Sequence, residues 1–134
     1  MISQVGQIFN DPTLNSLKLS LEVAAKRHDA LASNIANFNT PGYHRVDLSS
    51  NFKNSFAVAL RQLDEGQSAQ EVNMVAPQVE VDEKQNIPRM DGNTVNLEQE
   101  TTEVIKNQSD FDFAGRILAL KYSALKQAIS GTVS

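Results

Sequence analysis

Few residues of this 134-residue chain have a type and spacing that could catalyse a reaction. It contains two histidines, His28 and His44, and no cysteine, which excludes thiol catalysis and cysteine-ligated metal sites. Ser33 follows His28 by five residues and Asp29 by four, but a catalytic triad is defined by geometry on a scaffold, not by closeness in sequence. We therefore expect both histidines to be structural or surface residues, and we expect the protein not to be an enzyme.

The acidic run at 79–83, VEVDE, could suggest a cation site. It lacks the glycine and the ligand spacing of a calcium-binding loop. The chain has no His-Glu-x-x-His motif for zinc, and its six glycines are scattered and form no phosphate-binding loop. The run is therefore interpreted as a solvated surface, and neither a metal nor a cofactor is expected.

Charge and hydropathy narrow the classes of partner. The net charge is -4 and there is no basic run, so the electrostatic signature of a nucleic-acid-binding protein is missing. The chain contains no run of about 18 apolar residues, so no membrane-spanning helix is predicted. The first residues, MISQVGQIFNDP, lack the pattern of a secretory signal peptide, so a role outside the cytoplasm would require another export route.

The first long element predicted is a helix from Asp11-Pro12 to about Phe38. Aspartate can cap a helix, and proline is favoured in its first turn. Pro41 and Gly42 predict an abrupt stop after it. Mostly apolar residues recur along this helix with alternating spacings of three and four, typical of a helix that packs along another helix: Leu14, Leu17, Leu21, Ala24, His28, Leu31, Ile35 and Phe38.

A second long helix is predicted near the other end. Asn96 and Gln99 resemble a capping box, Gly131 is a plausible stop, and Glu98, Glu100 and Glu103 carry negative charge that suits the positive start of a helix. Its main repeat is Leu97, Thr101, Val104, Gln108, Phe111, Gly115, Leu118, Tyr122, Leu125 and Ile129, and a neighbouring line is Ile105, Ile117, Leu120, Ala124 and Ala128. A face this broad needs cover on more than one side, so we infer that other subunits cover it.

The predicted fold class is mainly α. Two long terminal helices pair as an antiparallel, coiled-coil-like hairpin, with a short third helix near 51–63 and an irregular, partly β middle. One structural domain is expected, in four segments. They are a flexible segment at 1–10, the first helix with its turn and the short helix at 11–63, a polar middle loop or hairpin at 64–93, and the last helix at 94–134.

The segment at 31–43, LASNIANFNTPGY, resembles the signature of bacterial flagellar rod and hook proteins, close to L-A-N-N-I-A-N-x-x-T-P-G-Y. The matching residues are Asn34, Ile35, Ala36, Asn37, Thr40, Pro41, Gly42 and Tyr43. The departures are Ser33 in place of the usual Asn, and Phe38 where a small residue is common. Three other features are similar to those of a proximal rod protein: the short length, the Arg27-His28 pair and DGNTVNLEQE at 91–100.

This resemblance implies a structural subunit of the drive shaft that crosses the periplasm and transmits torque from the inner-membrane ring to the hook and filament. The implied route is the flagellar type III export apparatus, without a cleaved signal peptide. The implied partners are other copies of the chain, the ring–rod adaptor (the FliE family) and the adjacent rod proteins (the FlgC family). Neither nucleic acid nor direct membrane insertion is implied.

Twelve residues of the two helices are predicted to make assembly contacts: Leu14, Leu17, Leu21, Leu31, Ile35, Phe38, Val104, Phe111, Leu118, Tyr122, Leu125 and Ile129. Ordinary packing within the chain is the alternative for each of them. Asn34 and Asn37 are predicted to hold the end of the first helix and the turn through side-chain to backbone hydrogen bonds. The alternative function is a soluble coiled-coil adaptor or secretion chaperone that binds a partner helix.

Overall fold

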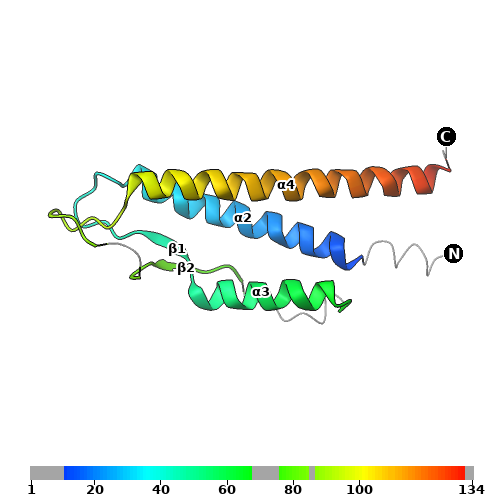
Figure 1. The fold of residues 1–134 in the computed structure, drawn as a ribbon, viewed down its shortest axis with the longest axis horizontal. Helices are drawn as coiled ribbons and strands as arrows, with labels where there is room; N and C mark the ends of the chain where they lie inside the picture. Colours follow the sequence, from blue (N-terminus) through cyan, green and yellow to red (C-terminus); the bar gives the residue numbers. More distant parts are fainter. Residues whose placement is uncertain (1–10, 68–75, 85–86, 132–134) are drawn as a thin grey trace.

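The computed structural model describes residues 11–67, 76–84 and 87–131, so the expected flexible segment at 1–10 lies outside the described residues. In chain order its elements are α2 (Pro12–Ala36), β1 (Val46–Leu48), α3 (Ser50–Asp64), β2 (Val79–Val81) and α4 (Leu97–Ser130). Figure 1 shows α2 and α4 running antiparallel along the length of the molecule, with α3 on the other side of α2. The predicted mainly helical class with a small β middle is confirmed.

Helix α2 begins where the sequence predicts. The side chain of Asp11 accepts a hydrogen bond from the Thr13 backbone N–H at 2.9 Å, and Pro12 occupies the first turn. The helix ends at Ala36, slightly before the predicted Phe38, because Asn37 adopts a non-helical conformation (φ -108°, ψ 12°). Its 25 residues span about 38 Å.

Helix α4 also has the predicted ends. Asn96 accepts a hydrogen bond from the Gln99 backbone N–H at 3.1 Å, and Gly131 terminates the helix in the left-handed conformation, at φ 67°. With 34 residues, α4 is about 51 Å long and is longer than α2. None of the described helices is both long enough and apolar enough to cross a membrane.

The middle of the chain forms one helix and one small sheet. Strands β1 and β2 pair antiparallel, with Val46 opposite Val81 and Leu48 opposite Val79. Ser49 caps α3 by accepting from the Phe52 backbone N–H at 3.0 Å. The short helix predicted from the spacing of its apolar residues is therefore present.

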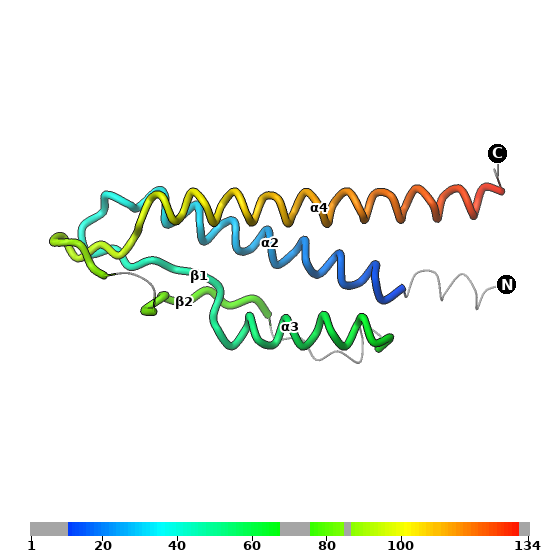
Figure 2. Tube along the Cα trace, viewed as in Figure 1, coloured from blue at the N-terminus to red at the C-terminus, as the bar shows by residue number. Residues whose placement is uncertain are grey.

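The apolar core lies between α2, α3 and β1. Its buried members are Leu19, Val23, Leu48, Phe52, Ala59 and Leu63. Leu19 and Val23 were not in the predicted repeat of α2, whereas His28, which was, is exposed. The repeat described only the face of α2 that meets α4, and the second face packs on α3. Figure 2 shows α2 between the two other helices.

Two residues of α4, Asn107 and Gly115, lie at its contact with α2. Asn107 is buried and donates from Nδ2 to the carbonyl oxygen of Ala24 at 2.8 Å, a polar contact that favours one register of the helix pair. Gly115 faces Leu21, and a Cβ added at Gly115 would lie 3.9 Å from the Leu21 Cδ2 atom. That separation is an ordinary van der Waals contact, so the glycine is not required by space.

We predict that Gly115→Ala raises the free energy of unfolding by about 0.5–1 kcal/mol, because alanine favours the helical backbone and fits here. Urea unfolding followed by circular dichroism measures the change. Gly92→Ala is the matched comparison and should lower stability by about 1–2 kcal/mol, because Gly92 has φ 80° and its Cβ would lie 3.5 Å from the Gly42 Cα atom. Equal effects of the two substitutions would contradict this account.

Candidate functional site

The two segments that carry the family resemblance lie against each other at the loop end of the helix pair. Gly42 donates its backbone N–H to the carbonyl of Asp91 at 2.8 Å, and Thr94 donates to the carbonyl of Tyr43 at 3.0 Å. The side chain of Arg89 donates to the carbonyl of Phe38. The turn at 37–43 and the segment at 89–95 thus hold each other through main-chain contacts, and we call this region the interlocked end.

Asn93 joins the two segments from within. Its side chain is fully buried, and Nδ2 donates to the carbonyl oxygens of Asn37 at 2.9 Å and Thr40 at 2.8 Å. Its Oδ1 accepts from the Val95 backbone N–H at 2.7 Å. The carbonyls of Asn37 and Thr40 also accept the backbone N–H groups of Thr40 and Tyr43, so one asparagine from a distant segment adds a second hydrogen bond to each of them.

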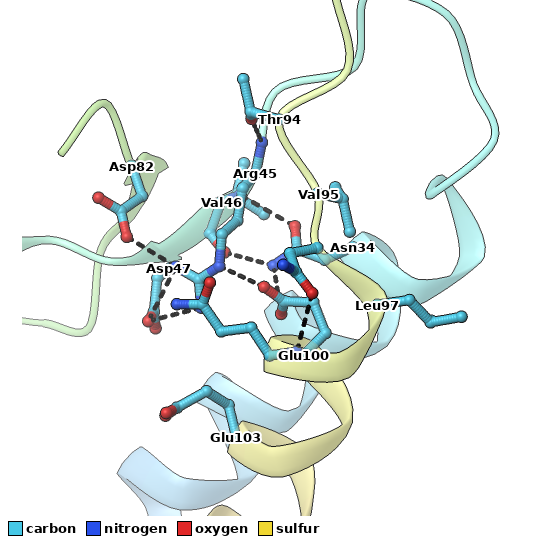
Figure 3. A network of polar contacts seen from close by, with 12 residues as sticks. Asn34, Arg45, Val46, Asp47, Asp82, Thr94, Val95, Leu97, Glu100 and Glu103 are labelled. Atoms are coloured by element: carbon cyan, nitrogen blue, oxygen red, sulfur yellow. Dashed lines mark hydrogen bonds and ion pairs between the residues drawn. The ribbon is translucent and has the colours of Figure 1, made fainter. Parts of the chain in front are cut away.

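Asn34 performs a similar task in the last turn of α2. Its Oδ1 accepts from the Val46 backbone N–H at 2.9 Å, and its Nδ2 donates to the Val46 carbonyl at 2.7 Å (Figure 3). The same Nδ2 donates to Glu100 Oε2 at 3.1 Å. Asn37, one turn later, donates from Nδ2 to the Ser33 carbonyl at 2.8 Å. Both asparagines therefore contact backbone groups of the chain itself.

A network of buried charges lies next to Asn34 (Figure 3). Arg45 is 1% exposed and donates from Nε to Glu100, which is fully buried on α4. Its Nη1 donates to Asp82 Oδ2 at 2.7 Å, and its backbone N–H donates to the Thr94 hydroxyl at 2.7 Å. Arg45 thus connects three separate stretches of the chain.

Arg27 extends the network along the helices. Its Nε and Nη2 donate to the two carboxylate oxygens of Asp47, both at 3.0 Å, and Nη2 also donates to Glu103 Oε2 at 2.8 Å. A bidentate arginine–carboxylate pair is among the stronger charged hydrogen bonds. Helices α2 and α4 and strand β1 are therefore linked at one point.

The pKa values of these groups reflect their pairing. Burial raises the pKa of Asp47, but the hydrogen bonds and charge of Arg27 outweigh it and bring the pKa to about 2. The hydrogen bond from Arg27 lowers the pKa of Glu103, and the hydrogen bond to Asp47 raises that of Arg27. These acids are ionised at neutral pH and serve as partners of the arginines, which makes the network a structural clamp.

The structure places the twelve predicted assembly residues in three groups. Leu14 and Leu31 are buried within the chain, so they pack in its own core. The half-buried residues are Leu17, Leu21, Ile35, Phe38, Val104, Leu118 and Leu125, and the exposed ones are Phe111, Tyr122 and Ile129. Their contacts with other subunits remain a prediction.

A second apolar surface on α4 was not among those twelve residues. Phe113 and Leu120 are 67% and 66% exposed, and with the exposed Ala124 and the half-buried Ile117 they follow a spacing of 4-3-4 along the helix. We call these four residues the exposed stripe. Ile117, Leu120 and Ala124 belong to the second line of apolar residues noted in the sequence of this helix. That line was the signal in the sequence for this surface. Phe113 also borders a groove of about 640 Å³ between α2, α3 and α4, lined by Leu17, Val23 and Phe56 among others.

The sequence analysis missed the roles of Arg45 and Glu100. Glu100 was expected to complement the helix dipole, but its side chain is buried against Arg45. Glu100 precedes Val104 by 4 residues and Asn107 by 7, which places it on the face of α4 that meets α2. This spacing was the signal in the sequence for the burial of Glu100. Among residues 11–67, 76–84 and 87–131, no group of three or more His, Asp or Glu could hold a metal ion.

Comparison with known proteins gives concordant results. The sequence pattern of the family described as "Flagella basal body rod protein" matches residues 21–44. The flagellar basal body rod protein FlgB of Aeromonas hydrophila is 30% identical over 118 residues, covering 84% of this chain and 88% of that protein. FlgB of Escherichia coli strain K12 is 27% identical over 133 residues, covering 92% of this chain and 88% of its own.

We predict that Glu100→Gln lowers the free energy of unfolding by about 3 kcal/mol, because it leaves Arg45 buried without its carboxylate partner on α4. Urea denaturation followed by circular dichroism measures this. Glu98→Gln is the control, since Glu98 is exposed in the same turn, and its effect should stay within about 0.5 kcal/mol. Similar losses in both variants would argue against the clamp.

The pKa of Asp47 predicts an acid-dependent loss of stability. A carboxylate whose pKa falls from 3.8 in the unfolded chain to about 2 in the folded chain contributes stability above pH 4 and loses it as the pH falls toward 2. The loss from this group is about 2 kcal/mol. Unfolding measured between pH 5 and pH 2 should therefore decline less steeply in Asp47→Asn than in the unaltered protein, and parallel curves would refute this assignment.

Proposed function

Since the chain belongs to the FlgB family of flagellar basal body rod proteins, we propose that it transmits torque as a subunit of the proximal rod, between the inner-membrane ring and the hook and filament. The family is structural and is not an enzyme family. A rod subunit must bind several neighbours and resist deformation, and both requirements can be compared with the described residues.

The observation that carries this proposal is the exposed stripe on α4. A 34-residue helix that pairs with a shorter helix on one side presents Phe113 and Leu120 to solvent on another. Apolar side chains that lie in a row along a helix form a surface suited to a partner helix. The adjoining groove of about 640 Å³ gives that surface a concave border.

The internal arrangement favours stiffness. The charged clamp and the interlocked end join α2, β1 and α4 through buried contacts. Asn34, Asn37 and Thr40 of the family signature make hydrogen bonds within the chain, so they serve the fold of the subunit. The surface of α4 is then available for contacts between subunits. A contact that joins different surfaces of successive copies, and does not close on itself, generates a helical tube.

The proposal extends to location and partners. We infer a place in the rod within the periplasm, and export by the flagellar type III apparatus without a cleaved signal peptide. Contacts with copies of the chain, with the ring–rod adaptor (the FliE family) and with the adjacent rod proteins (the FlgC family) follow from the family resemblance. The twelve helix residues predicted earlier remain candidates for these contacts, except Leu14 and Leu31, which the chain itself buries.

A coiled-coil adaptor or secretion chaperone is the competing function. Purified basal bodies distinguish the two, because a rod subunit is retained in them as a constituent and a chaperone is not. A chaperone would also remain a small oligomer of fixed size in solution.

We predict that Leu120→Asp and Phe113→Asp each abolish swimming and filament formation without unfolding the subunit. Burying a charge in an apolar contact costs several kcal/mol. Both side chains are mostly exposed in the chain alone, so its free energy of unfolding should change by only about 0.5 kcal/mol. Motility in soft agar and thermal melting of the purified variants measure the two effects.

Ala119→Asp is the matched control. It introduces the same charge one residue before Leu120, at an exposed position outside the stripe, and swimming should be retained. Normal swimming of both stripe variants would refute the proposed subunit contact. Loss of swimming in the control as well would show that any charge on this part of α4 is harmful.

A further inference from the structure

Residues 76–84, which contain β2, lie on the outside of the molecule. None of these residues is buried, and only Pro77 and Asp82 are half-buried. The two valines of β2, Val79 and Val81, are 41% and 47% exposed. We call residues 76–84 the strap. Because its apolar side chains keep much of their surface in water, the hydrophobic effect contributes little to its attachment.

Directional polar contacts hold the strap on β1. At one end of the pairing, Ser49 donates its backbone N–H to the carbonyl of Gln78 at 2.8 Å. At the other end, Asp82 donates its backbone N–H to the carbonyl of Arg45 at 2.9 Å, and its Oδ2 accepts from Arg45 Nη1 at 2.7 Å (Figure 3). Between them, Glu80 Oε1 accepts from the backbone N–H of the first residue of α3 at 3.2 Å.

Strand β1 has further contacts that do not involve the strap. The backbone N–H and carbonyl of Val46 both pair with the side chain of Asn34 on α2, at 2.9 and 2.7 Å. The side chain of Asp47 pairs with Arg27 of the same helix. Strand β1 is therefore attached to α2 whether or not β2 is paired with it.

The buried arginine would also keep charged partners without the strap. Arg45 donates from Nε to Glu100, and its Nη1 and Nη2 atoms each lie 3.4 Å from Asp47 Oδ2. A buried charge that loses its last partner is strongly unfavourable, but Arg45 loses only one of three carboxylates when Asp82 leaves. The charged clamp therefore does not prevent release of the strap.

We propose that the strap separates from β1 as one unit, restrained mainly by the Arg45–Asp82 ion pair, while α2, β1 and α4 keep their contacts. Opening exposes the edge of β1 that carries the Ser49 N–H and the Arg45 carbonyl, and it admits water to the Arg45 guanidinium. The chain thus contains a local conformational switch that operates without separation of its long helices. This inference concerns the isolated chain and does not rest on the rod function.

Hydrogen exchange of single backbone amides, followed by NMR on the full chain, tests this opening. The N–H groups of Ser49 and Asp82 lie at opposite ends of the pairing, so one shared opening should give them protection factors within about threefold of each other. The N–H of Val46 is on the same strand but bonds to Asn34, so it should be at least about tenfold more protected.

The variant Asp82→Asn removes the charge of the ion pair with little change in side-chain size. It should speed exchange of the Ser49 amide about tenfold, because a hydrogen bond to a charged group is stronger than one between neutral groups. Exchange of the Val46 amide should change by less than about twofold. Glu83→Gln is the matched control, since it removes the same charge at the next, exposed residue, and it should leave both amides unchanged.

Two results would overturn the proposal. One is equal protection of the Ser49, Asp82 and Val46 amides in the unaltered protein, which would mean that the strap opens only together with the rest of β1. The other is equal acceleration of the Ser49 and Val46 amides in Asp82→Asn. The first comparison needs no variant, so it decides the matter even if Asp82→Asn does not fold.

Discussion

The arrangement of the long helices depends on the buried carboxylate of Glu100 on α4, which forms an ion pair with Arg45 and accepts a hydrogen bond from Asn34 of α2 at 3.1 Å. The side chains of Arg45 and Glu100 are both buried, and a buried charge without its partner is strongly unfavourable. Apolar contacts between two helices with seven-residue repeats tolerate a shift of register, because leucine, isoleucine and valine replace one another with little cost. A buried carboxylate on α4 that must meet both Arg45 and Asn34 of α2 does not tolerate such a shift. Asn107, which bonds to the Ala24 carbonyl, imposes the same constraint farther along the pair.

Polar and apolar residues have separate roles at the interlocked end and on the surface of α4. Much of the contact between distant segments at the interlocked end is made by buried asparagines and charges, including Asn34, Asn93 and Arg45. Apolar residues such as Phe113 and Leu120 lie instead on the surface of α4. Buried polar groups at the interlocked end specify one geometry through directional bonds, whereas exposed apolar side chains on α4 can associate with another protein over a broad area. Such a division allows the chain to keep its own shape while apolar side chains remain on its surface.

The sequence predicted the elements that depend on local chemistry. Asp11 with Pro12, Asn96 with Gln99, and Gly131 set helix ends through contacts within a few residues, and these ends were confirmed. The clamp could not be predicted in the same way, because Arg45 and Glu100 are 55 residues apart and meet only after the middle of the chain has folded. The second buried face of α2 was missed for a related reason. The seven-residue repeat accounted only for the contact of α2 with α4, whereas Leu19 and Val23 of α2 pack on a third helix, α3.

The position of the interlocked end has a mechanical consequence. The described chain starts and stops at one end of the molecule (Figure 1). Apart from the ion pair of Asp11 with Lys121 at that end, the polar cross-links from α2 to α4 described above lie nearer the middle and the other end. A force that pulls Asp11 and Gly131 apart, perpendicular to the helix axes, would break the contacts between α2 and α4 one after another. A load directed along the helices would be shared by the whole interface in shear, where all contacts resist together. The subunit should therefore be strong along its length and weak to peeling.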